Sequence, residues 1–155
     1  IEDKKDALLL ILDQINDVRN FGAIIRTAEV SGVDAIIVQN QSSAPINADT
    51  VKTSAGGIFN VPICKVSHIK DAIYHLKSSN ITVIAASEKA DKNIYDLSLK
   101  KSVAIIMGSE ERGISSSVIK LSDEVVKLPM FGKIESLNVS VASGIFLYEV
   151  IRQRI

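Results

Sequence analysis

Three short segments of the sequence carry polar side chains whose types suit the recognition of a charged or hydroxylated ligand. The first segment holds Asn20 and Arg26, the second holds Glu110, and the third holds Ser136 and Asn138. A guanidinium group pairs with phosphate through two parallel hydrogen bonds, while amide, hydroxyl and carboxylate groups supply further donors and acceptors. Taken singly these residues are unspecific, because asparagine and serine also cap helices and most arginines are solvated surface cations. They are therefore candidates for one site only if the fold brings them together.

The second segment, from Gly108 to Gly113, has two glycines at the spacing of a nucleotide phosphate loop. No Lys-Ser or Lys-Thr pair follows it, so the sequence does not indicate a nucleoside triphosphate site. An ordinary turn between a strand and a helix also explains the two glycines. Gly108 directly follows an apolar run, where the missing side chain lets a ligand approach backbone N–H and C=O groups. Glu110 would place a carboxylate at the same edge.

Histidine and cysteine do not form a reactive cluster in this sequence. His68 and His75 are seven residues apart on an expected helix, a rise of about 10.5 Å, which is too far for both to bind one metal ion. Cys64, on an expected edge strand, is more typical of a small apolar filler than of a nucleophile. Because no Ser-His-Asp arrangement and no metal-ligand cluster is found, we expect neither hydrolytic nor metal chemistry.

Length and composition indicate one soluble globular domain that spans residues 1–155. Of its 155 residues 46% are apolar, enough to bury a sizeable core, and we find no internal repeat or linker. No apolar run approaches the roughly 20 residues that cross a bilayer, and no secretory leader opens the sequence. The single cysteine fits a reducing compartment, so we expect a cytoplasmic protein. Since the first residue is isoleucine, we expect this domain to come from a longer protein with a further domain upstream.

The charges of the sequence cancel, which limits how it can bind a polyanion. Eighteen Lys and Arg residues balance eighteen Asp and Glu residues, so no overall field attracts nucleic acid. Any contact with nucleic acid must therefore depend on a local group of cations. The candidates are Lys4, Lys5, Arg19, Arg26, Arg112, Lys133, Arg152 and Arg154.

An alternation of strands and helices is expected to position the polar segments. Apolar runs indicate strands at 7–12, 35–38, 62–66, 81–86, 103–107 and 125–128. Three- and four-residue periodicity predicts helices at 21–30, 48–54, 68–79 and 115–121 and a last helix from 137, whereas 90–101 is expected to be a polar connection. This alternation predicts an α/β fold with a mostly parallel sheet, helices on both faces, and ligands outside the carboxyl ends of the strands. Each polar segment directly follows a strand.

The last helix is expected to form a tightly packed face. Val141, Ile145 and Tyr148 recur along it at three- and four-residue steps. Gly144 lies among small residues in its middle, where glycine costs about 1 kcal/mol relative to alanine, so we expect another backbone to approach it closely. Helix caps are expected at Asn20, at Ser67 and at either Ser136 or Asn138.

The three polar segments resemble the three motifs of the SpoU (TrmH) family of RNA ribose 2′-O-methyltransferases, within the SPOUT superfamily. The matching stretches are Asn20 to Ala28 (NFGAIIRTA), Ile106 to Gly113 (IMGSEERG), Leu128 to Met130 (LPM) and Ser136 to Ala142 (SLNVSVA). They occur in the family's order and span nearly the whole chain. Within the family, the sequence is most similar to the members that methylate a guanosine of large-subunit ribosomal RNA.

This resemblance implies a deep trefoil knot in the C-terminal third of the fold and S-adenosyl-L-methionine as the cofactor. It also implies an RNA substrate, a homodimer formed through the first and last helices, and no metal. RNA recognition in the family usually depends on an additional domain, which is the further domain expected here. The residues whose backbone would hold the cofactor are Ala86, Gly108, Leu128, Met130 and Leu137.

In the family, Arg26 corresponds to the candidate catalytic residue. Arginine side chains keep their proton at neutral pH, so the family mechanism has the substrate's phosphate orient or activate it; the alternative role is to position that phosphate. By the same resemblance, Asn20, Glu110, Ser136 and Asn138 would orient the arginine, the ribose and the cofactor loops. Two other functions stay open, namely methylation of transfer RNA and a non-catalytic module that binds S-adenosylmethionine or RNA. The presence of all five polar residues argues against the non-catalytic module.

Overall fold

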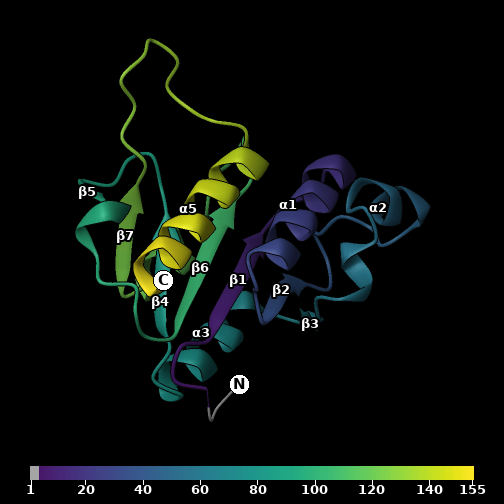
Figure 1. Cartoon of the computed structure of the whole chain (residues 1–155), viewed down its shortest axis with the longest axis horizontal. Helices are drawn as coiled ribbons and strands as arrows, with labels where there is room; N and C mark the ends of the chain where they lie inside the picture. Colours follow the sequence, from purple (N-terminus) through teal and green to yellow (C-terminus); the bar gives the residue numbers. More distant parts are fainter. Residues whose placement is uncertain (1–3) are drawn as a thin grey trace.

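Within the described residues, 4–155 of the computed structural model, the chain forms one parallel sheet of seven strands. The strands are β1 (Leu8–Asp13), β2 (Ala35–Gln39), β3 (Ile63–Val66), β4 (Thr82–Ala86), β5 (Lys92–Asn93), β6 (Val103–Gly108) and β7 (Glu124–Lys127). Their order across the sheet is β3-β2-β1-β6-β4-β7-β5, and every pairing is parallel (Figure 1). The expected α/β fold with a mostly parallel sheet is therefore confirmed, as is the edge position of the strand at 62–66.

Helices cover both faces of this sheet. They are α1 (Val18–Val30), α2 (Ala48–Thr53), α3 (Ile69–Ser78), α4 (Ser116–Leu121) and α5 (Val139–Arg154), with short 3-10 turns η1 (Gly57–Phe59) and η2 (Ile94–Asp96). One face packs against α1 and α5, and the other against α3 and α4. The short helix α2 packs on α1 (Figure 1). Gly22 allows this contact, because a Cβ atom there would lie 1.7 Å from Thr53 Oγ1.

Strand β1 lies in the interior of the sheet, between β2 and β6, and all six of its residues are buried. Leu8, Leu10 and Leu12 belong to the core beneath α1 and α5, whereas Leu9 and Ile11 belong to the core beneath α3. Such alternation follows from the two-residue period of a strand. Each fully buried leucine or isoleucine contributes about 1.5–3 kcal/mol relative to an exposed one, so β1 is the centre from which both layers are organised.

Two helix caps differ from the sequence prediction. Helix α1 begins at Val18, with Asp17 as the N-cap: its carboxylate accepts a hydrogen bond from the backbone N–H of Asn20 at 2.8 Å. The predicted cap at Asn20 is therefore wrong, because aspartate three residues earlier is an equally good cap. The N-cap position of α3 is His68, so the prediction of Ser67 is also wrong.

The segment 90–101, expected to be a polar connection, contains strand β5 and the turn η2. Lys92 and Asn93 pair with Val126 and Lys127 of β7 at the edge of the sheet. A strand of two residues is too short to show an alternating pattern, so a local pattern could not predict it.

Helix α5 is capped by Asn138, whose side-chain oxygen accepts from the backbone N–H of Ser140 at 3.0 Å, as expected. The repeating residues Val141, Ile145 and Tyr148 do not belong to the buried core, and they are 51%, 37% and 51% exposed. The buried face of α5 is instead formed by Val139, Ser143, Phe146, Leu147 and Val150.

Gly144 does not meet another backbone at close range. A Cβ atom there would have one near neighbour, the methyl carbon of Thr27 on α1, at 3.5 Å, which is an ordinary van der Waals distance. The expected close approach of a backbone is therefore wrong within the described chain. Gly144 still lies at the contact between α1 and α5, next to Thr27.

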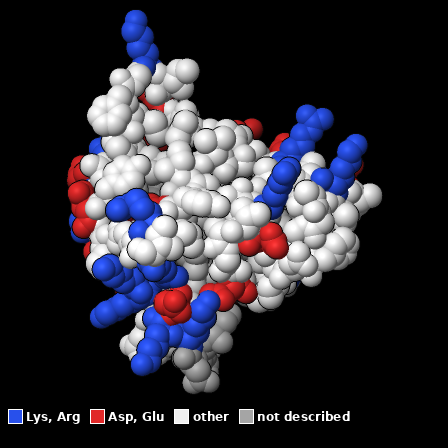
Figure 2. Space-filling model, in the orientation of Figure 1, with Lys and Arg blue, Asp and Glu red and all other residues white. Residues whose placement is uncertain are grey.

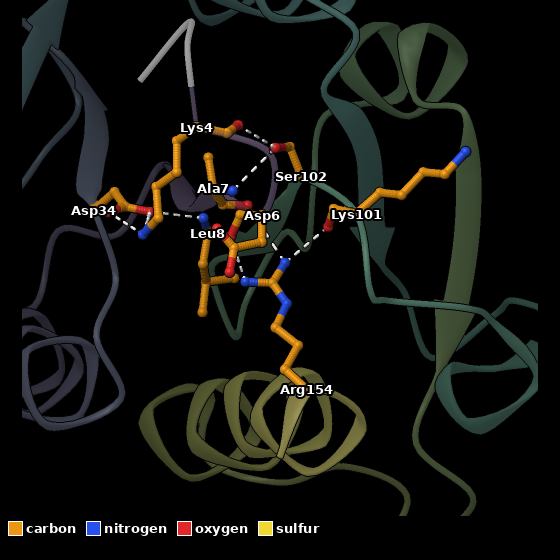
Figure 3. A network of polar contacts seen from close by, with 8 residues as sticks. All are labelled: Lys4, Asp6, Ala7, Leu8, Asp34, Lys101, Ser102 and Arg154. Atoms are coloured by element: carbon orange, nitrogen blue, oxygen red, sulfur yellow. Dashed lines mark hydrogen bonds and ion pairs between the residues drawn. The ribbon is translucent and has the colours of Figure 1, made fainter.

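At the amino ends of the strands, Arg154 joins the end of α5 to two segments of the chain, the one before β1 and the one before β6 (Figure 3). Its guanidinium group donates to the carbonyl oxygens of Asp6 at 2.6 Å, Leu99 at 3.1 Å and Lys101 at 2.7 Å. Burial lowers the pKa of Arg154 from its usual value, against the opposing attraction of nearby carboxylates. The helix that carries Asn138 at its start is thus held at its other end by a charged side chain.

Candidate active site

A cavity of about 610 Å³ opens at the carboxyl ends of β4, β6 and β7. Its walls come from three parts of the chain: 86–89 after β4, 107–114 at the end of β6, and 127–142 between β7 and the first turn of α5. This is the edge at which parallel α/β sheets bind their ligands. The second and third parts contain two of the polar segments singled out in the sequence.

All five residues expected to contact a cofactor line this cavity. They are Ala86, Gly108, Leu128, Met130 and Leu137. Three of the proposed catalytic residues, Glu110, Ser136 and Asn138, also line it. The fold therefore brings eight of the ten predicted site residues to one place.

Glu110, Asn138 and Asn20 form a hydrogen-bonded group that joins the three polar segments. The Nδ2 group of Asn138 donates to Oε1 of Glu110 at 2.9 Å and to Oδ1 of Asn20 at 2.9 Å. The same Glu110 oxygen accepts from the backbone N–H of Val139 at 3.0 Å. Asn20 thus lies beside the cavity through Asn138, although it does not line the wall. One carboxylate thus accepts hydrogen bonds from a side chain and from a backbone N–H in the first turn of α5, where N–H groups have no partner within the helix.

The loop that carries Glu110 depends on Gly108. Beyond this residue the chain folds back on itself, and the N–H of Gly113 donates to the carbonyl of Ser109 at 2.8 Å. A Cβ atom on Gly108 would lie 2.3 Å from the carbonyl carbon of Gly113 and 2.3 Å from the backbone nitrogen of Ile114. Only glycine leaves room for this return of the backbone, so the residue is required by the loop itself as well as by any ligand.

Arg26 is exposed on α1 and does not line the cavity. No hydrogen bond or ion pair to its side chain is found within residues 4–155. The fold therefore separates the proposed catalytic arginine from the cavity of its own chain. Ser136 lies at the rim, where its hydroxyl is exposed.

Sequence reasoning missed several residues that line the cavity. Ser87, Glu88 and Lys89 directly follow β4, so the rule that ligands bind at the carboxyl ends of parallel strands was a signal for them. Phe146 and Ala142 come from the buried side of α5 and gave no signal, because their role depends on where the helix packs.

The lining suits a ligand with both charged and apolar parts. The lining includes the acidic residues Glu88 and Glu110 and the basic residues Lys89 and Lys127, together with the apolar side chain of Phe146 and the strand ends. No group of three or more His, Cys, Asp or Glu side chains that could hold a metal ion occurs in the described part of the chain. Among the described helices, none is long and apolar enough to cross a bilayer.

Known proteins are similar to this chain in sequence and in fold. A model of the SpoU rRNA Methylase family matches residues 7–148. The 23S rRNA (guanosine-2'-O-)-methyltransferase RlmB of Vibrio vulnificus is 40% identical over 148 residues, which cover 96% of this chain and 60% of that protein. The AdoMet-bound rRNA methyltransferase from Sinorhizobium meliloti is similar in structure, with a TM-score of 0.92 and 28% identity over 100% of this chain and 59% of the other.

A second solved structure is the SpoU methyltransferase AviRb from Streptomyces viridochromogenes in complex with AdoMet. Its TM-score is 0.90 at 27% identity, over 97% of this chain and 59% of the other. The chain therefore spans about 60% of the length of these relatives.

Proposed function

Since the chain belongs to the SpoU rRNA methylase family, we propose that it is the methyl-transferring part of an RNA 2′-O-methyltransferase. Its substrate is a ribose 2′-hydroxyl, and its target is a guanosine of large-subunit ribosomal RNA. The observation that carries this proposal is the cavity at the carboxyl ends of the strands, where Glu110, Asn138 and Asn20 join the three family motifs. The name of the Vibrio vulnificus relative supports the guanosine target.

The cofactor of this proposal is S-adenosyl-L-methionine, which when bound supplies an activated methyl group on a sulfonium sulfur. The cavity volume of about 610 Å³ lies in the usual range for small-molecule sites. Mixed apolar and charged walls fit a ligand that combines an adenine ring with an amino acid. The residues that would hold it are Ala86, Gly108, Leu128, Met130 and Leu137, all of which line the cavity. The two relatives solved with AdoMet support the choice of cofactor.

The side chains of the chain have to hold an RNA backbone and a ribose beside this cavity. A 2′-hydroxyl is a weak nucleophile, so its orientation and the removal of its proton limit the reaction. We assign Arg26 to the phosphate, which its planar guanidinium group binds through two hydrogen bonds. Glu110 and Asn138 keep the wall of the cavity in place, and Ser136 offers an exposed hydroxyl at the rim to the ribose.

We further propose that the enzyme works as a homodimer through α1 and α5. Val141, Ile145 and Tyr148 form an exposed, mostly apolar stripe on α5, and Val30 on α1 is 62% exposed. Figure 2 shows that the middle of this face is largely free of charged side chains, most of which lie toward its periphery. A second copy on this face would cover the stripe and bring exposed α1 residues such as Arg26 toward the cavity of its partner.

Three further features belong to the proposal. The segment after β7 passes through a loop of the chain in a deep trefoil knot, a feature of the family that the sequence resembles.

Residues 1–155 are the catalytic domain of a longer protein, in which another domain recognises RNA; the greater length of the relatives supports this division. The cytoplasm, where ribosomal RNA is modified, is the proposed location.

Analysis of methylated nucleosides tests this function. Ribosomal RNA from a strain that lacks the protein is incubated with the full-length enzyme and isotope-labelled S-adenosyl-L-methionine, and its nucleosides are measured by mass spectrometry. We expect the label in 2′-O-methylguanosine. Label on a base would contradict the reaction class, and label only in transfer RNA would contradict the substrate. Cofactor binding without transfer to any RNA would indicate a non-catalytic module.

A further inference from the structure

Asp13, at the carboxyl end of β1, is a buried carboxylate that the proposed mechanism does not use. Its residue is 3% exposed, and it does not line the cavity. A buried charge of this kind is unfavourable unless other groups donate hydrogen bonds to it. The partners of Asp13 should therefore reveal why the chain keeps an acid at this position.

Both hydrogen bonds found for this carboxylate come from Ser115. The backbone N–H of Ser115 donates to Oδ2 of Asp13 at 2.8 Å, and its hydroxyl donates to the same oxygen at 2.9 Å. Ser115 is the N-cap residue of α4, yet its side chain makes no capping bond. Serine at this position normally accepts a hydrogen bond from the first turn of the helix. Here the hydroxyl is directed to Asp13 instead.

Asp13 lies beside both ends of the loop that carries Glu110. In the sheet, Asp13 is the register partner of Gly108, the residue at which the loop begins. Its side chain binds Ser115, the residue at which the loop runs into α4. Glu110, between these two ends, reaches Asn138 and Val139 at the start of α5. A loop fixed at both ends on one residue has little freedom to tilt, so Glu110 is kept in reach of its partners.

We propose that Asp13 is a positioning residue for the cofactor cavity. It acts through Ser115, which keeps the loop 109–114 where Glu110 can bind Asn138 and where Ile114 forms part of the wall. This inference rests on the proposed function for its kinetic consequences, whereas its structural consequence, a loop held by Asp13, does not depend on any ligand.

Three substitutions in the full protein test the proposal. Asp13→Asn keeps the shape of the side chain but removes the charge, and Ser115→Ala removes one of the two hydrogen bonds. Ser115→Thr retains both donors and serves as the rescue variant. The matched control is Asp34→Asn at the opposite end of β1, where the carboxylate accepts from the backbone N–H of Leu8 at 2.9 Å, far from the cavity.

Hydrogen exchange of backbone amides, measured without cofactor, is the first readout. We expect the amides of 109–115 to exchange about tenfold faster in Asp13→Asn and Ser115→Ala than in the wild type, because bonds to a charged acceptor are lost. Ser115→Thr and Asp34→Asn should exchange like the wild type in this loop. Uniformly faster exchange over the whole sheet in Asp13→Asn would show a general stabilising role and overturn the proposal.

Cofactor kinetics are the second readout. We expect the KM for S-adenosyl-L-methionine and the Kd for S-adenosylhomocysteine to rise about tenfold in Asp13→Asn and Ser115→Ala, with kcat within about twofold. Unchanged KM, Kd and loop exchange in both variants, with a wild type that binds the cofactor, would overturn the role of Asp13. A wild type that does not bind the cofactor would instead overturn the proposed function, while the exchange experiment would still decide whether Asp13 holds the loop.

Discussion

Arg26 differs from the other proposed catalytic residues because, within the described residues, it neither lines the cavity nor bonds to a residue that does. Its replacement should therefore separate binding from catalysis. We expect Arg26→Ala to keep the Kd for S-adenosylhomocysteine within about twofold of the wild type, while methyl transfer to RNA falls by about a hundredfold or more. Arg26→Lys should recover little activity, since lysine lacks the planar group that binds phosphate at two points. Calorimetry and a transfer assay measure the two effects.

Arg19 provides the control for this experiment. It is an exposed cation on the same helix, so Arg19→Ala should change both quantities much less than Arg26→Ala. Turnover of Arg26→Ala close to that of the wild type would show that the arginine has no part in the reaction.

Gly108 permits a sharper test of how the cavity is built. In Gly108→Val the new Cβ atom would lie 2.3 Å from backbone atoms of Gly113 and Ile114, so the loop cannot keep its shape. We expect the variant to lose measurable binding of S-adenosylhomocysteine in a calorimetric titration. Gly132→Val, where no atom lies within 4 Å of the new Cβ, should bind nearly as the wild type does. Equal binding by both variants would be evidence against a rigid loop at Gly108.

At the scale of single elements, α5 contains a nearly buried acid whose ionisation affects stability. Glu149 is 5% exposed and accepts from the Nε atom of Arg152 at 2.8 Å and from Gln153 Nε2 at 2.8 Å. The hydrogen bonds from Arg152 lower the pKa of Glu149 below its usual value; burial acts in the opposite direction, and the bond from Gln153 lowers it further. The ionised form is thus favoured by folding.

The pKa of Glu149 is lower in the folded state than in the unfolded state, where it is about 4.3. The ionised carboxylate therefore stabilises the fold above that pH, and this stabilisation is lost as the pH falls through the pKa of the folded state. We expect the melting temperature of Glu149→Gln to decline less than that of the wild type between about pH 5 and pH 3. The control is Glu124→Gln, which removes an exposed pair with Lys92 and should alter the acid side of the profile little. Parallel profiles for the wild type and Glu149→Gln would contradict this role of Glu149.

The elements also show which features of the fold the sequence patterns could predict and which they could not. Apolar runs located six of the strands. The runs are clearest for β1, β2, β4 and β6, because a strand buried on both faces has little polar surface. The same patterns could not show that Val141, Ile145 and Tyr148 point away from the core, since periodicity identifies a stripe but not its partner. Among the site residues, the ends of the strands predicted the cavity, whereas the bond between Asp13 and Ser115 joins residues that are far apart in the chain.

For the whole molecule, the exposed stripe on α5 predicts self-association. Sedimentation should give a mass near twice the 16.8 kDa of the chain. Tyr148→Asp should shift the protein toward the monomer, because a charge would be buried in an apolar contact. Tyr74→Asp is the matched control: Tyr74 is 58% exposed on α3, on the opposite face of the sheet, compared with 51% for Tyr148. A wild type that stays monomeric at high concentration would contradict the proposed dimer.

The order of the strands was not predictable from local patterns. Six strands could be recognised one by one, but their arrangement with β6 between β1 and β4 depends on packing between segments that are distant in the sequence. Gly108 and Asp13 become neighbours only through this arrangement. The site residues that belong to the sequence motifs could therefore be predicted from the sequence. The proximity of Asp13 to Gly108 could not, because it depends on the strand order.

The position of β1 between β2 and β6 also affects the chain while it is being synthesised. Its two neighbours are β2, which emerges from the ribosome soon after it, and β6, whose register partners are 95 residues away. At translation rates of about 5–20 residues per second, one edge of this apolar strand stays unpaired for roughly 5–20 s. During that interval the nascent chain exposes hydrogen-bonding groups that another strand can pair with. The strand order of the finished fold thus makes the early translation products of this chain candidates for chaperone binding.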